Sequence, residues 1–349
     1  MLNGITYCPI MYSKNAELSA LSNLRDELRP GIFPILSLRP LPHAHYIEHT
    51  INRIKEARPG RFALDLDSSR FNRSNSLLDP AEFDRLFLHN DGFQNYYNLV
   101  GDIDGAVPVI VRSDGDCQFL DSQIDRALEL GRGLIVRIER GRFYGAEEVV
   151  DRVLARTDEV AFVVDAGWDK DILLAQPWSY NMVRMISERS SEVEIIVSSS
   201  SFPSSFSHMG AKGLSTIDDR ELFRRLRQST NANLIYGDWG STRRSTEATP
   251  MRAVPRIDLA HTGEWLSFRR VGQEGFPAIA ARLVLDDAFD HTIDCWGKSL
   301  ISDLAAGDHE ALKGTARATS ARINMHLTIQ AASGAGQTLP DETPYTDPF

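Results

Sequence analysis

Short apolar runs rich in β-branched residues alternate along this chain with segments whose apolar residues recur at helical spacing. Strands that are separated by helices pair in parallel, because each helix carries the chain back to the same end of the sheet. The alternation therefore predicts an α/β protein with a parallel sheet. The eight predicted strands are residues 5–10, 32–38, 62–66, 107–111, 134–138, 160–164, 193–197 and 234–237.

Two architectures satisfy this alternation, an open doubly wound sheet and a closed barrel. Eight strand–helix units favour the barrel, because closure of the sheet removes both of its exposed edges. A (β/α)8 barrel needs about 250 residues, and the chain has 349. The sequence therefore predicts a single TIM-like barrel domain over residues 1–330 that carries additional elements.

The additions are predicted after the eighth strand. Residues 256–262 and 265–271 form two alternating runs around Gly263, which predicts a β-hairpin inserted at 256–271. A closing helix is expected at 277–286, another helix at 295–305 and one further strand at 322–329. Small and polar residues with three prolines predict a disordered tail at 331–349.

Composition limits the compartment and the partners. The formal net charge is −10 and the pI about 5.4, which argues against non-specific nucleic-acid binding. Three scattered cysteines form neither a disulfide framework nor a CxxC zinc motif, and this favours a reducing compartment. No signal peptide opens the chain and no apolar stretch approaches the ~18 residues of a membrane span. We expect a soluble cytoplasmic protein without a membrane partner.

No motif in the sequence specifies a cofactor, a metal or a reaction. The chain has no P-loop, no GxGxxG and no GxSxG elbow. His43, His45 and His49 form HxHxxxH, but at the opening of a predicted helix, where an exposed helix start is the better interpretation. No cofactor and no metal are predicted, and whether the protein is an enzyme stays open.

Polar residues gather where the predicted strands end, which is where β/α barrels carry their sites. Residues two apart on a strand face the same side. Asp65 and Asp67 therefore point into the barrel mouth if Leu64 and Leu66 meet the helices, and the same parity turns Arg137 and Glu139 inward. Acidic and basic strand ends then face each other across a pocket.

This mouth has two interpretations. It is either a site that binds a polar or anionic ligand, or a ring of salt bridges that satisfies a polar barrel layer. Six residues are predicted to converge there: Asp65, Asp67, Arg112, Arg137, Asp165 and Asp238. The candidate ligand-binding set also contains Arg39 and two serines of the run after the seventh strand, Ser198 and Ser201. That run is either an anion-binding loop or simply a polar loop.

Several of these segments, taken in order, resemble the beta-protein family over nearly the whole chain. The similar motifs are YCPI at 7–10, FPIL at 33–36, SFP at 201–203, GDWG at 237–240 and HLT at 326–328. The sequence departs from the family pattern at Tyr12, where a lysine is usual, and at Ser37, where an acidic residue is usual. If the family's residues at those two positions hold a ligand, this chain either has lost that ligand or uses Lys14 and Arg39 instead, so Lys14 joins the candidate set.

The resemblance implies a partner role. The family's founding member, a satellite-phage product, is associated with protecting bacteria from a killing protein encoded beside it. We therefore expect an antitoxin- or immunity-like protein of a phage-defence or toxin–antitoxin module, whose partner is a toxin or defence protein from an adjacent gene. An acidic protein suits a basic partner. The alternative is a barrel enzyme that acts on a phosphorylated or nucleotide-like small molecule at the mouth.

Overall fold

The structure, a computed structural model, describes residues 1–41, 46–57, 60–70, 80–88, 92–111, 118–143, 145–243, 254–291 and 293–334. Its main sheet has eight parallel strands in the order β4-β3-β2-β1-β9-β7-β6-β5. They are β1 (Tyr7–Tyr12), β2 (Ile35–Leu38), β3 (Phe62–Leu66), β4 (Ala106–Pro108), β5 (Leu134–Glu139), β6 (Val160–Trp168), β7 (Glu194–Ser200) and β9 (Leu234–Asp238). Each strand overlaps one of the eight predicted runs, so the prediction of a parallel α/β sheet is confirmed.

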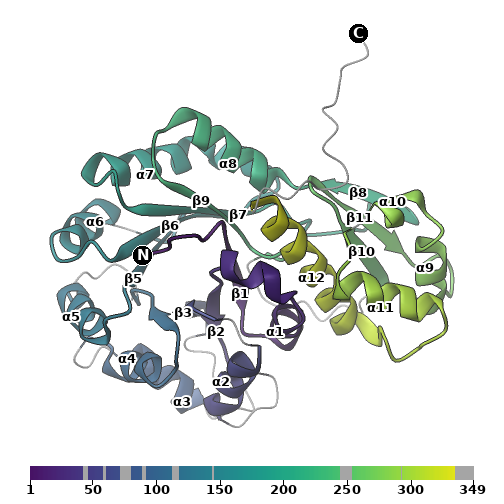
Figure 1. The fold of residues 1–349 in the computed structure, drawn as a ribbon, viewed down its shortest axis with the longest axis horizontal. Coiled ribbons are helices and arrows are strands. Elements are labelled where there is room, and N and C mark those ends of the chain that lie inside the picture. The colour runs from purple at the N-terminus through teal and green to yellow at the C-terminus, as the bar shows by residue number, and fades with distance from the viewer. Residues whose placement is uncertain are drawn as a thin grey trace.

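The two outer strands of this sheet approach each other. Just beyond β4, Val109 forms a parallel bridge with Ile135 of β5, and the Ile110 N–H donates to the Ile135 carbonyl at 2.9 Å. The sheet therefore curls into a nearly closed, barrel-like surface, and helices surround it (Figure 1). An open sheet, which would leave β4 and β5 as distant edges, does not describe this arrangement.

Helices on the outside bury one face of each strand. They are α1 (Asn15–Ser22), α2 (Ile47–Glu56), α3 (Pro80–Asp84), α4 (Gln94–Gly101), α5 (Leu120–Leu130), α6 (Ala146–Leu154), α7 (Gln176–Arg189) and α8 (Asp218–Ser229). In α5 the spacing of Leu120, Ile124 and Ala127 makes one buried stripe. Gly131 ends that helix with φ 61°, a left-handed conformation in which glycine carries no Cβ penalty.

The pleat of the strands divides the apolar residues into two cores. One core fills the barrel interior and includes Cys8, Ile10 and Ile135. The other, between sheet and helices, takes their sequence neighbours, such as Tyr7, Met11 and Val136. Alternation along each strand thus assigns successive side chains to opposite cores, and the inward set leads to the mouth.

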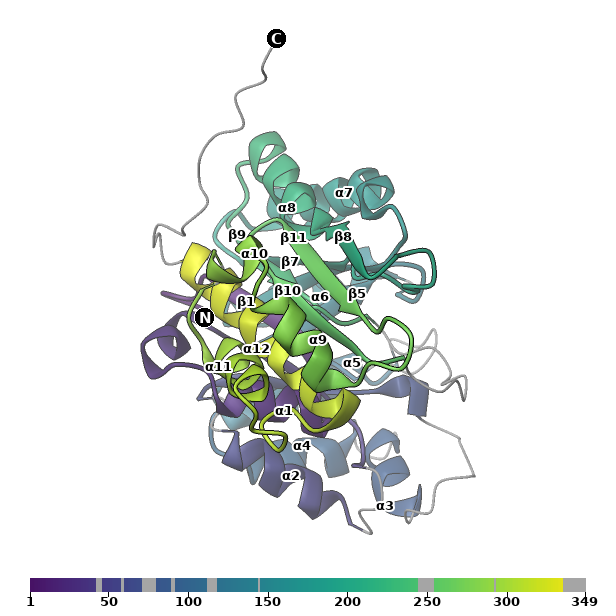
Figure 2. The ribbon, with the colours of Figure 1, turned by 90° about the vertical axis from the view of Figure 1, so that its right-hand side faces the viewer.

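A second, antiparallel sheet lies beside the barrel with the order β10-β11-β8 (Figure 2). Strands β10 (Arg256–Ala260) and β11 (Glu264–Arg269) pair as the hairpin predicted around Gly263. Strand β8 (Lys212–Thr216) was not predicted, because its sequence KGLST is short and polar and its one apolar side chain, Leu214, is exposed. Around this sheet pack α9 (Phe276–Leu283), α10 (Asp287–Asp290) and α11 (Trp296–Ala305).

The predicted strand at 322–329 is wrong, because these residues belong to a long helix, α12 (Gly314–Gly334). The alternation of polar and apolar residues there is real, but both sets are buried. Helix α12 runs between α1, α11 and β10, so its buried polar side chains face other elements of the protein: Asn324 donates to the carbonyls of Ala20 and Asn23. The helix extends to Gly334, into the segment predicted as a tail, and residues 335–349 lie outside the described residues.

Candidate functional site at the barrel mouth

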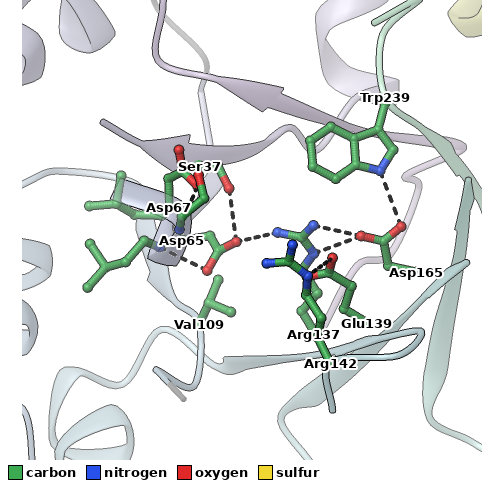
Figure 3. A network of polar contacts seen from close by, with 12 residues as sticks. Ser37, Asp65, Asp67, Val109, Arg137, Glu139, Arg142, Asp165 and Trp239 are labelled. Atoms are coloured by element: carbon green, nitrogen blue, oxygen red, sulfur yellow. Dashed lines mark hydrogen bonds and ion pairs between the residues drawn. The ribbon is translucent and has the colours of Figure 1, made fainter. Parts of the chain in front are cut away.

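At the carboxyl ends of the strands, one arginine joins two carboxylates across the barrel (Figure 3). Arg137 of β5 donates through Nη1 to Asp65 Oδ2 of β3 at 2.5 Å. Through Nε and Nη2 it donates to Asp165 Oδ2 of β6, at 3.1 and 2.6 Å. The inward direction predicted for Asp65 and Arg137 from strand parity agrees with these contacts.

This triad is nearly buried, and its arginine stays protonated. Arg137 is 10% exposed, Asp65 14% and Asp165 0%. Burial alone lowers the pKa of Arg137, but the charges and hydrogen bonds of Asp165 and Asp65 outweigh it and raise that pKa above its ordinary value. Asp165 also accepts hydrogen bonds at Oδ1 from the Gly167 N–H at 2.9 Å and Trp239 Nε1 at 3.2 Å. The guanidinium is therefore a fixed positive charge.

A cavity of about 110 Å³ opens beside the triad. Aromatic rings form one part of its wall: Tyr12, Phe87, Phe143 and Trp239. Charged groups form the other: Asp65, Asp67, Arg137, Glu139 and Arg142. Arg142 is 53% exposed and lies 3.6 Å from Glu139, so its guanidinium is held loosely compared with that of Arg137. The cavity is smaller than the ~300 Å³ lower bound of drug-sized pockets, and it matches a single charged head group.

Arg39 and Lys14 lie on the next sector of the mouth. Arg39 forms an ion pair with Asp67, and its guanidinium stacks on the Tyr12 ring at 3.6 Å. The Lys14 Nζ lies 4.7 Å from the centre of that ring. Arg39 is almost fully buried, yet its Nε and Nη1 have no hydrogen-bond partner among the described residues. Such donors usually find a partner, so they mark a place where a ligand acceptor would be stabilised.

The two candidate serines differ. Ser198 lies opposite Asp165 in the register of β6 and β7, and its buried Oγ has no partner within the described ranges. Ser201 is not at the mouth: its Oγ donates to Asp219 at 2.6 Å and accepts the Asp218 N–H at 3.1 Å. It therefore fixes the start of α8 to the end of β7, and its place in the predicted site is a correction.

Asp238 is the second correction, because it faces away from the barrel interior. It accepts hydrogen bonds from the hydroxyls of Tyr7 and Tyr236 at 2.6 and 2.9 Å and contacts His326 Nε2 of α12 at 2.8 Å. On β9 the inward residue is its neighbour Trp239, which belongs to the interior core. Parity counted from Ile235 would have placed Trp239, and not Asp238, in the mouth.

Two further predictions, the mouth residue Arg112 and the HxHxxxH motif, fall wholly or partly outside the described residues. Arg112, His43 and His45 are not described, while His49 is exposed on α2. Across the part of the chain that the structure describes, no group of three or more His, Cys, Asp or Glu side chains could hold a metal ion. The sequence did not single out Tyr12, Phe87, Phe143 or Trp239, because buried aromatic residues alone do not distinguish a site from a core.

Two comparisons with known proteins point to the same family. Residues 7–332 match the family described as Beta protein. Over 337 residues the chain is 28% identical to "Protein beta" of Enterobacteria phage P4, and the match covers 93% of this chain and 92% of that protein. Within the described residues, no helix is long and apolar enough to cross a membrane.

Proposed function

The chain belongs to the beta protein family, and we propose that it is an antitoxin- or immunity-like protein of a phage-defence or toxin–antitoxin module. In this proposal it acts in the cytoplasm by binding a toxin or defence protein from an adjacent gene. The scaffold is a (β/α)8 barrel of the TIM type, with the hairpin inserted after its eighth strand and with α11 and α12 as a C-terminal extension.

The observation that carries the proposal is the size and lining of the mouth cavity. About 110 Å³ accommodates one side-chain head group of a partner, and a whole nucleotide needs more room. Carboxylates of Asp65 and Glu139 would attract a lysine or arginine of a basic partner, and the Tyr12 and Trp239 rings would contact its aliphatic stem. The net charge of −10 favours the same kind of partner.

Co-expression tests this function. The chain is expressed with each neighbouring gene, and cell survival and pull-down from the same cultures are measured. We expect the wild type to protect cells and to retain the toxic product. Arg137→Ala and Asp165→Asn should abolish protection, because both variants break the triad that holds the Asp65 carboxylate in the cavity wall.

Two further variants keep this test decisive. Arg189→Ala removes an ion pair to Asp151 on the outer helices and should leave protection intact. Glu139→Lys reverses one of the two carboxylates that would attract the basic head group, and its ion-pair partner Arg142 is exposed, so the fold should survive while binding weakens. Full protection by folded Arg137→Ala and Glu139→Lys would remove the mouth from the proposal.

A small-molecule ligand is the second candidate. It is favoured by the Ser198 hydroxyl beside Asp165 and by Nε and Nη1 of Arg39, which have no hydrogen-bond partner among the described residues. Such donors suit the oxygens of a phosphate or carboxylate. In this alternative a barrel enzyme would bind a small phosphorylated molecule at the mouth. Titration of the purified chain with inorganic phosphate separates the two, because saturable binding that Ser198→Ala and Arg39→Gln weaken supports the second candidate only.

A further inference from the structure

A second cavity, of about 450 Å³, lies at the opposite end of the barrel. Its lining includes Thr6, which precedes β1, and Asn233, which precedes β9, so it opens at the amino ends of the parallel strands. Helix α8 and the last residues of α12 complete it. The volume falls within the roughly 300–1,000 Å³ of small-molecule sites, and this end of a β/α barrel ordinarily serves stability alone.

The two charged groups that the described residues contribute to this lining are both arginines, and no described aspartate or glutamate lines the cavity. Arg220 donates to Gln330 through Nε and Nη2, the latter reaching the backbone carbonyl at 3.0 Å. Its guanidinium stacks on the Tyr236 ring at 4.4 Å, and its Nη1 has no partner among the described residues. Arg227, one helical turn from Phe223, is exposed and likewise forms no ion pair with any described residue.

Apolar side chains form another part of this lining, among them Ile5, Leu234 and Phe223 of α8. Phe223 packs edge-on against Tyr236 of β9, with ring centres 5.5 Å apart. Tyr236 itself is almost fully buried and its hydroxyl is bound to Asp238, so Phe223 is the aromatic ring of this lining that a ligand can reach. Positive charge therefore lies next to an apolar surface in one cavity.

We propose that this cavity binds a phosphate or carboxylate group carried on a small apolar or aromatic body. Arg220 and Arg227 hold the anion, since guanidinium donors match the geometry of phosphate and carboxylate oxygens. Phe223, Ile5 and Leu234 contact the apolar body. The site is separate from the mouth and does not depend on the antitoxin-like function.

Two sources could supply this anion, a free small molecule or the chain itself. The last described residue, Gly334, lines the cavity, and residues 335–349 contain Asp341, Glu342 and Asp347 but no lysine or arginine. A full-length variant with Asp341→Asn, Glu342→Gln and Asp347→Asn separates the sources. If it binds the probe more tightly than the wild type does, the acidic segment is the competing occupant; equal binding assigns the site to the free molecule.

The probe is phenyl phosphate, titrated calorimetrically into the full-length protein, with phenol as the uncharged comparison. We expect saturable 1:1 binding of phenyl phosphate, at least ten-fold weaker in Arg227→Gln and weaker at high salt. Arg224→Gln is the matched control, because Arg224 lies on the same helix, is exposed and pairs with Glu221. The proposal is overturned if neither the wild type nor the triple variant binds phenyl phosphate, or if Arg224→Gln weakens binding as much as Arg227→Gln.

Discussion

Two buried ionic networks lie at the carboxyl ends of the strands, and they differ in what surrounds them. Around Arg137, the Asp65 carboxylate borders the cavity at the mouth, while Asp165 lies fully buried on the other side of the arginine. Around Asp238, two tyrosine hydroxyls and His326 are sealed beneath α12, with every group essentially inaccessible. Water can replace a lost partner in the first network and cannot in the second. We infer that the sealed network serves stability and the open one serves binding.

The largest effect is expected from Asp238→Ala. The substitution leaves Tyr7, Tyr236 and His326 without their shared acceptor inside the protein. The expected cost is about 3–5 kcal/mol of unfolding free energy, with a fall in Tm of roughly 5–10 °C. Thermal and urea denaturation measure it, with Asp104→Ala in an exposed turn as the control. A loss under about 1 kcal/mol would contradict the interpretation that the Asp238 network is sealed from water.

Arg137→Ala should lower the free energy of unfolding less than Asp238→Ala does, but it should abolish protection. It strands Asp65 beside a cavity that water can enter, and Asp165 keeps its hydrogen bonds from Gly167 and Trp239, so we expect a loss of about 1–3 kcal/mol. Protection in the co-expression assay should be lost at a temperature where the variant is folded. A stability loss as large as that of Asp238→Ala, together with retained protection, would make the mouth a structural salt-bridge layer.

Two adjacent serines on β7, one facing inward and one facing outward, test the same comparison between an open and a sealed position. Ser199 donates to the buried Asp219 at 2.6 Å, and Ser199→Ala should cost about 1–2 kcal/mol. The inward Ser198 has no partner in the described structure, and Ser198→Ala should change stability by less than ~0.5 kcal/mol. Paired urea titrations measure both values. Equal losses would show that inward and outward positions do not differ in this way.

The smallest effect concerns pH. Burial raises the pKa of Asp238, but the charge of His326 and the hydrogen bonds from His326, Tyr7 and the Gly240 N–H outweigh it, so the pKa lies below its ordinary value. A depressed carboxyl pKa adds stability above the unfolded pKa of about 3.9 and loses it as pH falls through the folded pKa. The difference in Tm between wild type and Asp238→Asn should therefore shrink as pH is lowered from 7 towards 3. A constant difference would contradict the ionised form of Asp238.

Sequence periodicity predicted much of the fold because the barrel strands are apolar runs that alternate with helices. All eight barrel strands and the hairpin overlap their predicted runs. Strand β8 was missed because a five-residue polar segment has no such pattern. Helix α12 was misassigned at 322–329, because a helix buried on all sides has no polar face to reveal its period.

The sequence by itself determined which side of each well-patterned strand faces inward, and hence the direction of Asp65 and Arg137. Local alternation contains that information, since a side chain's face depends only on its place in the pleat. Only the tertiary structure decided which ends meet: Arg137 reaches Asp65 over 72 positions of sequence, while Asp238 turns to His326 of a helix 88 positions away. Such pairings depend on the curvature of the sheet and on what packs against it, and neither is encoded in the spacing of neighbouring residues.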